Sequence, residues 1–294
     1  VANTAWSPDG QFVAFAMDDG SVKTFAHDGL IMSLNSSNDG NGQTLPVQAL
    51  AWSNNNVLAT ASTNTIWIQD QNSPTPSTLG PMAGNIQALA WLTGNRAHLL
   101  TAVNDQGELY VYDTTDGDSL WSERSWSGYG VLACSPDGAY LATQSPPGSD
   151  SSQGLMIWEV NTGLSFTSIQ TAGMNISALV WASDSRSIAV MGADGTLQVW
   201  DIQNRQKTFS QQLNTQQSQL AWSPDQHFLA AIDDAYNLLI LDRSNGNTLL
   251  STPLTMISQG SVFTGHALSW LPDSQTLVLA TSKMDCLQFK LSWF

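Results

Sequence analysis

The chain is a succession of short apolar runs separated by polar turn residues. Each run holds about five to eight β-forming residues and is bounded by Gly, Asp, Asn, Ser or Pro, as in residues 187–192 and 196–201. This pattern is typical of short strands joined by turns. No segment keeps a helical 3.6-residue period over ten residues. The pattern therefore predicts an all-β fold.

One phrase, Ala-Trp-Ser-Pro-Asp-Gly at residues 5–10, recurs through the chain. Its aromatic position defines seven anchors: Trp6, Trp52, Trp91, Cys134, Trp181, Trp222 and Trp270. Successive anchors are 46, 39, 43, 47, 41 and 48 residues apart. Four short strands per unit at this period are typical of a propeller blade. We predict a single domain over residues 1–294, a seven-bladed β-propeller of four-stranded antiparallel blades, with blades starting near residues 1, 47, 86, 129, 176, 217 and 265.

Local chemistry supports the strand boundaries. Ser-Pro-Asp-Gly at 7–10 and 135–138 predicts a turn, because proline fixes φ at the first central position and glycine takes a positive φ. These turns should close the hairpin between the first and second strands of a blade. Most anchors follow a leucine two residues earlier, on the same strand face. The anchor tryptophans are therefore predicted to be core residues between blades rather than parts of a cofactor site.

The ends of the third strands carry a family resemblance. Residues 200–201 are a Trp-Asp dipeptide, and related pairs occur at Trp158-Glu159, Tyr112-Asp113, Leu241-Asp242 and Gln69-Asp70. The chain thus resembles the WD-repeat family over all seven units, and bacterial WD-repeat domains in particular. A TolB-like six-bladed propeller also uses Trp-Ser-Pro-Asp-Gly before an apolar strand, but seven units and the Trp-Asp endings favour the first family.

Two features depart from the WD-repeat pattern. The family's Gly-His about nine residues before the anchor is absent, since Gly265-His266 lies only four residues before Trp270, so its buried hydrogen-bond tetrad cannot be complete. After the last third strand, at 287–291, only residues 292–294 remain. The last blade is therefore expected to lack its outer strand. The family's closure by the opposite terminus implies that residues upstream of Val1 supply it; otherwise the blade has an exposed edge.

The charge balance excludes one class of partner. The chain has 24 Asp and Glu against nine Lys and Arg, a net charge of −15, and only 11% of its residues are charged. Nucleic-acid binding depends on cations that neutralise phosphates, so we predict no nucleic-acid partner. An anionic membrane surface is disfavoured for the same reason.

Hydropathy and polar composition bear on localisation. The longest apolar stretches, such as 99–103 and 276–280, are about five residues long, far short of a membrane span, so no membrane insertion is predicted. The first ten residues do not resemble a signal peptide. Ser, Thr, Asn and Gln make up 101 of 294 residues. This neutral polar surface favours an extracytoplasmic or cell-surface protein, with a cytoplasmic location as the alternative.

The sequence offers little chemistry for catalysis. Its four histidines lie in four different units, and it has none of the usual nucleophile, metal, phosphate-loop or dinucleotide motifs. Paired carboxylates at 18–19 and 233–234 suit hairpin turns, with a calcium site as the alternative. Cys134 and Cys286 lie in β-type runs and are expected to be buried thiols. We predict no enzyme activity, no cofactor and no metal. Catalysis would require a set of reactive side chains at the central channel that matches no known motif.

The WD-repeat resemblance implies where a partner binds. In that family the face with the fourth-to-first and second-to-third connections is the usual platform, and the residue four before each anchor points toward the channel mouth there. In this chain those residues are Ala2, Gln48, Gln87, Gly130, Ser177, Ser218 and His266. Their identity varies among Ala, Gln, Gly, Ser and His, as expected of a surface without packing demands. The predicted channel-mouth binding residues are Gln48, Gln87, Ser177, Ser218 and His266, and ordinary solvated positions are the alternative.

An aromatic run on a fourth strand is a second candidate. Trp121, Trp126 and Tyr129 lie close together in the sequence, and Trp and Tyr are enriched at binding hot spots. Half-buried strand packing explains the run equally well. Long polar insertions at 35–44 and 145–153 are either functional or merely mobile.

The leading functional hypothesis is a non-enzymatic interaction module that holds a protein or peptide over the channel face and is part of a larger protein. The alternative is an extracytoplasmic sensor of a small ligand or glycan, such as the propeller of a bacterial receptor kinase. The sequence does not determine the oligomeric state.

Overall fold

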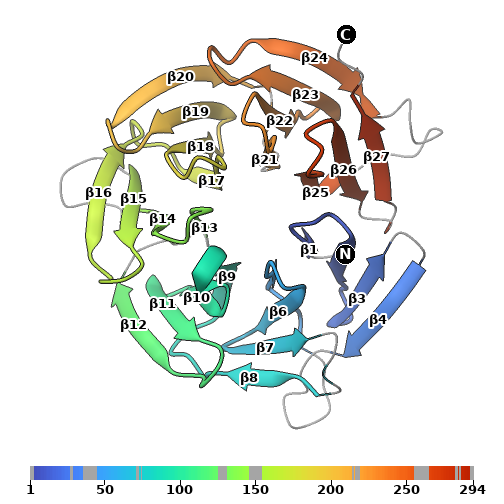
Figure 1. Ribbon diagram of the computed structural model, residues 1–294, viewed down its shortest axis with the longest axis vertical. Helices are drawn as coiled ribbons and strands as arrows, with labels where there is room; N and C mark the ends of the chain where they lie inside the picture. The colour runs from blue at the N-terminus through green and yellow to red at the C-terminus, as the bar shows by residue number, and fades with distance from the viewer. Residues whose placement is uncertain are drawn as a thin grey trace. The chain divides into compact units, whose positions relative to one another are not determined.

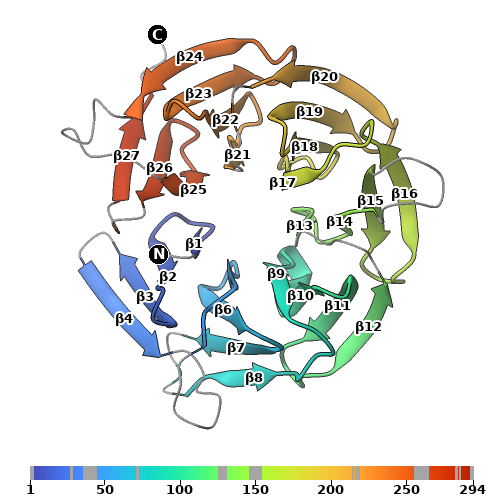
Figure 2. The same ribbon diagram turned by 180° about the vertical axis from the view of Figure 1, so that it is seen from behind.

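Seven antiparallel sheets follow one another along the described chain (Figures 1 and 2). The computed structural model describes residues 3–26, 29–35, 45–70, 73, 75–124, 131–145, 154–213, 215, 219–254, 265–281, 284 and 286–291. In this part of the chain 27 strands form the sheets, and the single helical element is the short 3₁₀ turn η1 (Gly94–Arg96). Each sheet, called a blade below, contains consecutive strands in sequence order. The predicted fold class, a seven-bladed propeller of antiparallel sheets, is confirmed.

The chain divides into two compact units. The first consists of Val1–Pro147 with Met156–Ser168, and the second of Gly148–Leu155 with Ile169–Phe294. The first unit holds blades 1 to 3. Blade 1 contains β1 (Asn3–Trp6), β2 (Phe12–Ala16), β3 (Ser21–Ala26) and β4 (Gly29–Asn35), and blade 2 contains β5 (Ala49–Trp52), β6 (Val57–Ser62), β7 (Thr65–Asp70) and β8 (Ser77–Leu79). Blade 3 contains β9 (Ile86–Trp91), β10 (Leu99–Asn104), β11 (Glu108–Asp113) and β12 (Ser119–Arg124).

Blade 4 contributes residues to both units, and the boundary between the units passes through its last two strands. It contains β13 (Leu132–Cys134), β14 (Tyr140–Gln144), β15 (Gly154–Glu159) and β16 (Ser165–Gln170). The second unit holds blades 5 to 7. Blade 5 contains β17 (Ile176–Trp181), β18 (Ser187–Gly192), β19 (Thr196–Asp201) and β20 (Gln206–Gln212), and blade 6 contains β21 (Leu220–Trp222), β22 (Phe228–Ile232), β23 (Asn237–Asp242) and β24 (Thr248–Pro253). Blade 7 contains β25 (Gly265–Trp270), β26 (Thr276–Thr281) and β27 (Cys286–Lys290). Among the described residues no helix is long and apolar enough to cross a membrane.

The anchor tryptophans connect neighbouring blades within each unit. In the first unit the Trp91 indole Nε1 donates to the carbonyl of Ala51, 3.1 Å away on the preceding blade. In the second, Trp222 donates to Val180 at 3.1 Å and Trp270 to Ala221 at 3.0 Å. All three side chains are buried among apolar neighbours. The prediction that this column is core is therefore confirmed for these tryptophans.

The Ser-Pro-Asp-Gly turn forms as predicted. In blade 1 the N–H of Gly10 donates to the Ser7 carbonyl at 2.9 Å, and Gly10 has a φ of 68°. The Ser7 hydroxyl donates to Asp9 and accepts from the Phe12 N–H. These bonds satisfy the turn's polar groups and set the start of the second strand.

Blade 7 has three strands in the described part of the chain, as the sequence predicts, and β27 is its last. Exposed and partly buried residues alternate along β27, and Cys286 is exposed. The prediction that Cys286 is buried is wrong, because this terminal strand of the sheet carries its first residue on the solvent side. Cys134 is partly buried, with its Sγ 3.5 Å from Thr101 Oγ1. Burial raises the pKa of the Cys134 thiol to about 12.

Candidate functional site

The predicted channel-mouth residues start the first strands of their blades. Gln48 lies just before β5 and is partly buried, and its carbonyl accepts from Asn3 Nδ2 at 3.1 Å. Its side-chain Oε1 is buried and has no hydrogen-bond partner among the described residues. Gln87 is exposed on β9 at the same position of the next blade. These two glutamines are therefore at equivalent positions in adjacent blades of the first unit.

The remaining channel-mouth residues belong to the second unit or lie outside the description. Ser177 on β17 is partly buried, and its hydroxyl donates to the Met191 carbonyl at 3.2 Å. The backbone of His266 is in β25, while Ser218 lies outside the described residues. A common binding role for the five residues stays a prediction.

Trp121 of the predicted aromatic patch is tied to the next blade. Its Nε1 donates to the Val160 carbonyl at 2.7 Å, and a Cβ added to Gly163 would come within 3.0 Å of its ring. Trp126 and Tyr129 lie outside the described residues. Close packing of the indole against Gly163 accounts for Trp121, and a role of the three aromatics in partner binding stays a prediction.

The carboxylates singled out in the sequence lie in hairpin turns where the structure describes their contacts. Asp19 Oδ1 accepts from the N–H of Ser21 at 2.9 Å and from its hydroxyl at 2.7 Å, and these two bonds lower the pKa of Asp19. Asp233 receives the N–H of Asn237 at 2.8 Å in the same way. Across the described chain no three His, Cys, Asp or Glu side chains form a group that would hold a metal ion.

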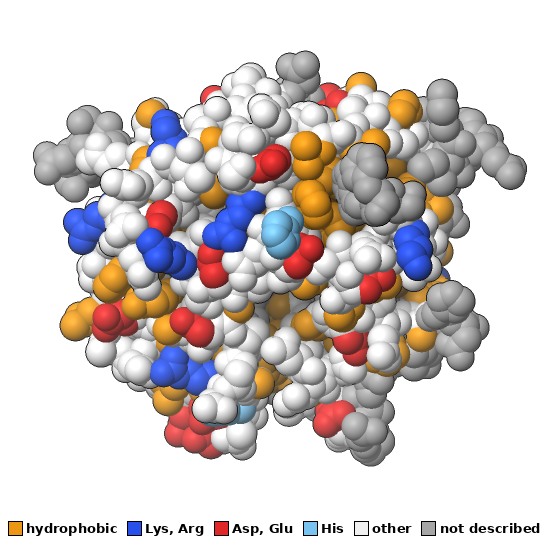
Figure 3. Space-filling model, turned by 45° about the horizontal axis from the view of Figure 1, so that its top comes forward, with side chains coloured by type: hydrophobic (Ala, Val, Ile, Leu, Met, Phe, Trp, Pro, Cys, Tyr) orange, Lys and Arg blue, Asp and Glu red, His pale blue; other side chains and the backbone are white. Residues whose placement is uncertain are grey.

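A charged hollow of about 820 Å³ lies between blades 5 and 6, at the end that carries the first-to-second-strand turns. Arg186 Nη2 lies 2.7 Å from Asp201 Oδ2. Arg243 of blade 6 reaches across to blade 5, where it pairs with Asp184 and donates to Ser187 Oγ at 2.7 Å. Figure 3 shows cationic side chains lying beside acidic ones on the displayed face. Both arginines of this hollow are paired with aspartates, and the Arg243–Asp184 pair links blade 6 to blade 5.

The Asp184–Arg243 pair predicts an acid-dependent stability. Burial alone would raise the pKa of Asp184, but N–H donors of Ser187 and Arg186 and the Arg243 guanidinium outweigh burial and lower the pKa. A carboxyl with a lowered folded-state pKa stabilises the protein above its unfolded-state pKa, and this stabilisation is lost as the pH falls through the folded-state pKa. Asp184→Asn is therefore expected to lower the free energy of unfolding at pH 7 by about 1–2 kcal/mol.

Urea denaturation from pH 7 to pH 2.5 tests this prediction. The difference between wild type and Asp184→Asn should narrow as the pH falls below about 4, the pKa of an unfolded aspartate, and through the lower folded-state pKa of Asp184. Asp118→Asn, an equal charge change at an exposed carboxylate, is the control and should change stability by less than about 0.5 kcal/mol. A constant difference at every pH would contradict the assigned role of the pair.

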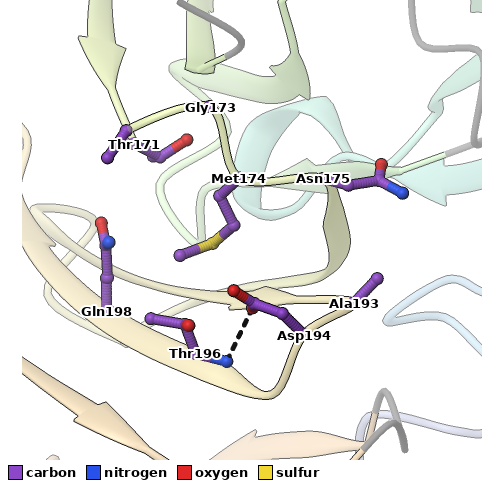
Figure 4. Close-up of a pocket in the computed structure, with 9 residues that line it drawn as sticks. Thr171, Gly173, Met174, Asn175, Ala193, Asp194, Thr196 and Gln198 are labelled. Carbon is purple, nitrogen blue, oxygen red and sulfur yellow. Dashed lines mark hydrogen bonds between the residues drawn. The ribbon is translucent and has the colours of Figure 1, made fainter.

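A second hollow, of about 510 Å³, lies at the opposite end of blade 5 and is called the blade 5 pocket below. It lies between the connection that enters the blade, residues 171–175, and the hairpin of residues 193–195, and Gln198 also lines it. Figure 4 shows Met174 projecting between Gln198 and Asp194. Met174 and Gln198 are nearly buried, whereas Asp194 is exposed. The pocket thus combines an apolar floor, formed by Met174, with a buried polar side chain, Gln198, and an exposed one, Asp194.

This pocket was not among the sites predicted from the sequence. The signal is present in the repeats, because Gln198 takes the position held by Trp67 in blade 2 and Tyr110 in blade 3. That correspondence depends on the strand register, in which Asp201 faces Ser187, Asp70 faces Val57 and Asp113 faces Leu99. Without the pairing of the strands, the sequence does not show which of these side chains lies between the entering connection and the hairpin of its blade.

Comparison with known proteins agrees with this architecture. Residues 166–201 match the family model described as WD domain, G-beta repeat. This segment runs from β16 through the first three strands of blade 5 and ends on Trp200-Asp201. No curated protein matches the sequence significantly.

Two solved structures resemble the chain over nearly its whole length. A chain in the crystal structure of a mitotic checkpoint complex has a TM-score of 0.79 at 19% identity, covering 100% of this chain and 87% of that one. The β-propeller domain of Myceliophteria thermophila Cps50 (Swd1) has a TM-score of 0.76 at 14% identity, covering 99% of this chain and 96% of that one. At these identities the likeness concerns the fold alone. The chain is therefore a seven-bladed β-propeller, and its residues 166–201 match the model of a WD repeat.

Proposed function

We propose that this chain is a non-enzymatic interaction module that binds a protein or peptide at the end of the blades formed by the second-to-third-strand hairpins and the blade-to-blade connections. The contrast between the two ends of blade 5 carries the proposal. At one end, arginines and aspartates form ion pairs with each other, one of which links blades 5 and 6. At the other end, the blade 5 pocket is open.

Two further observations support this assignment. Gln87 is exposed at the same end of blade 3, and the buried side-chain oxygen of Gln48 has no hydrogen-bond partner in the part of the chain that the structure describes. The similar chain in the mitotic checkpoint complex belongs to a multiprotein assembly. A propeller is a rigid scaffold on which loops and strand ends present binding groups, so this fold suits the role. The extracytoplasmic location and the ligand-sensor alternative remain predictions from composition.

A charge-reversal experiment tests the proposal. The purified chain serves as bait in extract from its source, beside a variant with Gln48, Gln87 and His266 changed to aspartate. The matched control places aspartate at Asn54, Asn95 and Gln275, which are exposed residues at the other end of the same three blades. We expect a partner that the wild type and the control capture and the first variant loses.

Other outcomes contradict the proposal. Capture that survives the Gln48, Gln87 and His266 changes would move the site away from this end of the blades. Equal loss in both variants would indicate a general effect of charge. No captured protein at all would favour the small-ligand sensor.

A further inference from the structure

The blade 5 pocket occupies a place that side chains fill in blade 3. The entering connection and the hairpin correspond in the two blades, because the N–H of Asp105 donates to the Asn85 carbonyl at 2.8 Å and the N–H of Ala193 donates to Asn175 at the same distance. The strand register then places Gln198 at the position of Tyr110. The two blades can therefore be compared residue by residue.

In blade 3 an aromatic ring and a carboxylate close this place. Tyr110 stacks on Tyr112 with ring centroids 5.8 Å apart, and its hydroxyl donates to Glu108 Oε2 at 2.6 Å. Asn104 Nδ2 donates to the same oxygen at 2.8 Å. Burial, followed by the hydrogen bond to Glu108, raises the pKa of Tyr110 to about 12, so the hydroxyl stays protonated. A tyrosine side chain therefore fits between an entering connection and a hairpin of this fold.

Blade 5 has smaller groups at the positions that close blade 3. Gln198 stands in place of Tyr110, Thr196 in place of Glu108, and Ala193 in place of Asp105. Between the two blades, the large residue also moves from the hairpin of blade 3 to the entering connection of blade 5, and glycine takes the other position. Gly84 and Asn104 of blade 3 correspond to Met174 and Gly192 of blade 5.

Both glycines leave room for neighbouring side chains. A Cβ on Gly192 would lie 2.6 Å from Met174 Cγ, and one on Gly84 would lie 2.4 Å from Asp105 Oδ1. The exchange seats Met174 against the hairpin backbone of blade 5. The pocket therefore has a floor of polarisable thioether where blade 3 has polar side chains.

The pocket also presents one hydrogen-bond donor and one acceptor. Gln198 Oε1 accepts a hydrogen bond from Trp200 Nε1 at 2.9 Å. Because the oxygen is used in this bond, the amide Nε2 of Gln198 is the group that can donate to a ligand. Asp194 Oδ1 accepts the Thr196 N–H at 2.9 Å, and its second oxygen has no hydrogen-bond partner in the described structure. Figure 4 shows both side chains beside Met174, while Asn175 points away from them. A phenol hydroxyl can donate to a carboxylate and accept from an amide at the same time.

We propose that the blade 5 pocket binds a tyrosine side chain of the protein partner, with the ring on Met174 and the hydroxyl between Asp194 and Gln198. This assignment rests on the proposed interaction function and names the residue that the site recognises. Sulfur–aromatic contact and a satisfied hydroxyl distinguish tyrosine from other side chains. Phenylalanine leaves Asp194 and Gln198 without partners. A lysine would pair with Asp194 but would not use the thioether floor.

A methionine-methyl NMR titration with N-acetyl-tyrosinamide tests the proposal without the unidentified partner. The chain has eight methionines, and Met174→Leu assigns the methyl signal of Met174. The aromatic ring should shift that signal upfield while the other methionines stay unchanged. A ligand of this size should bind with a Kd on the order of 1 mM.

Two variants sharpen the test. Gln198→Tyr places in blade 5 the side chain that already fits blade 3, and should abolish the shift by occupying the pocket. Ser251→Tyr adds the same residue at an exposed position of β24 in blade 6, and should leave the titration unchanged. Circular dichroism of each variant verifies that it is folded before the titration.

N-acetyl-phenylalaninamide and N-acetyl-lysinamide complete the comparison, and each is expected to bind at least about fivefold more weakly. Equal binding of the phenylalanine probe would overturn the role of the hydroxyl, and preferred binding of the lysine probe would overturn the choice of tyrosine. No Met174 shift at 20 mM tyrosine probe would overturn the pocket itself. A failed titration beside successful partner capture would separate this inference from the proposed function.

Discussion

Replacing Trp222 with alanine is expected to lower the free energy of unfolding by about 3–5 kcal/mol. The indole is 8% exposed and packs in a cluster with buried residues of blades 5 and 6, such as Leu197 and Leu229. Its Nε1 also donates to the Val180 carbonyl of blade 5 at 3.1 Å. Alanine leaves a cavity between two blades and an acceptor without its donor, and urea denaturation measures the combined loss.

Trp222→Phe is the matched control, because it keeps a ring in the cluster and removes the indole N–H. We expect it to cost about half as much as Trp222→Ala, since most of the apolar contact remains. An alanine variant within 1 kcal/mol of the wild type would show that the anchor column does not hold the blades together.

Gly195→Ala is expected to destabilise blade 5 by at least about 3 kcal/mol and to reduce the yield of folded protein. Gly195 has a φ of 80° in the hairpin between β18 and β19. A Cβ there would lie 2.4 Å from the Leu213 carbonyl oxygen and 2.6 Å from that of Thr215. Both obstacles are backbone atoms, so relief requires movement of the whole exit from blade 5. Thermal denaturation followed by circular dichroism measures the change.

Gly173→Ala separates the steric cost from the conformational one. Gly173 has a similar φ of 77°, but a Cβ there would meet no atom within 4 Å. This variant should therefore cost only the roughly 1 kcal/mol of a left-handed alanine. Equal effects of the two substitutions would contradict the proposed collision at Gly195.

The pocket in blade 5 shows why part of the candidate site was beyond sequence reasoning. The repeat is visible in the anchor spacing, but the meaning of Gln198 depends on its pairing and on the connection packed against it. Thr171 and Gln198 are 27 positions apart in the sequence and line one pocket. Trp121 likewise acquires its contact with Gly163 only when blade 4 packs beside blade 3.

The sequence by itself determined the all-β class, the seven units, the Ser-Pro-Asp-Gly turns and the three strands that the described residues form in the last blade. These features follow from strand periodicity and turn chemistry, which act over a few residues and recur with each repeat. Only the tertiary structure decided that Cys286 faces solvent, that Arg243 joins blade 6 to Asp184, and that one blade has an open pocket where another is filled. Such outcomes depend on which side chains of distant segments occupy the same volume, and close packing between segments decides that.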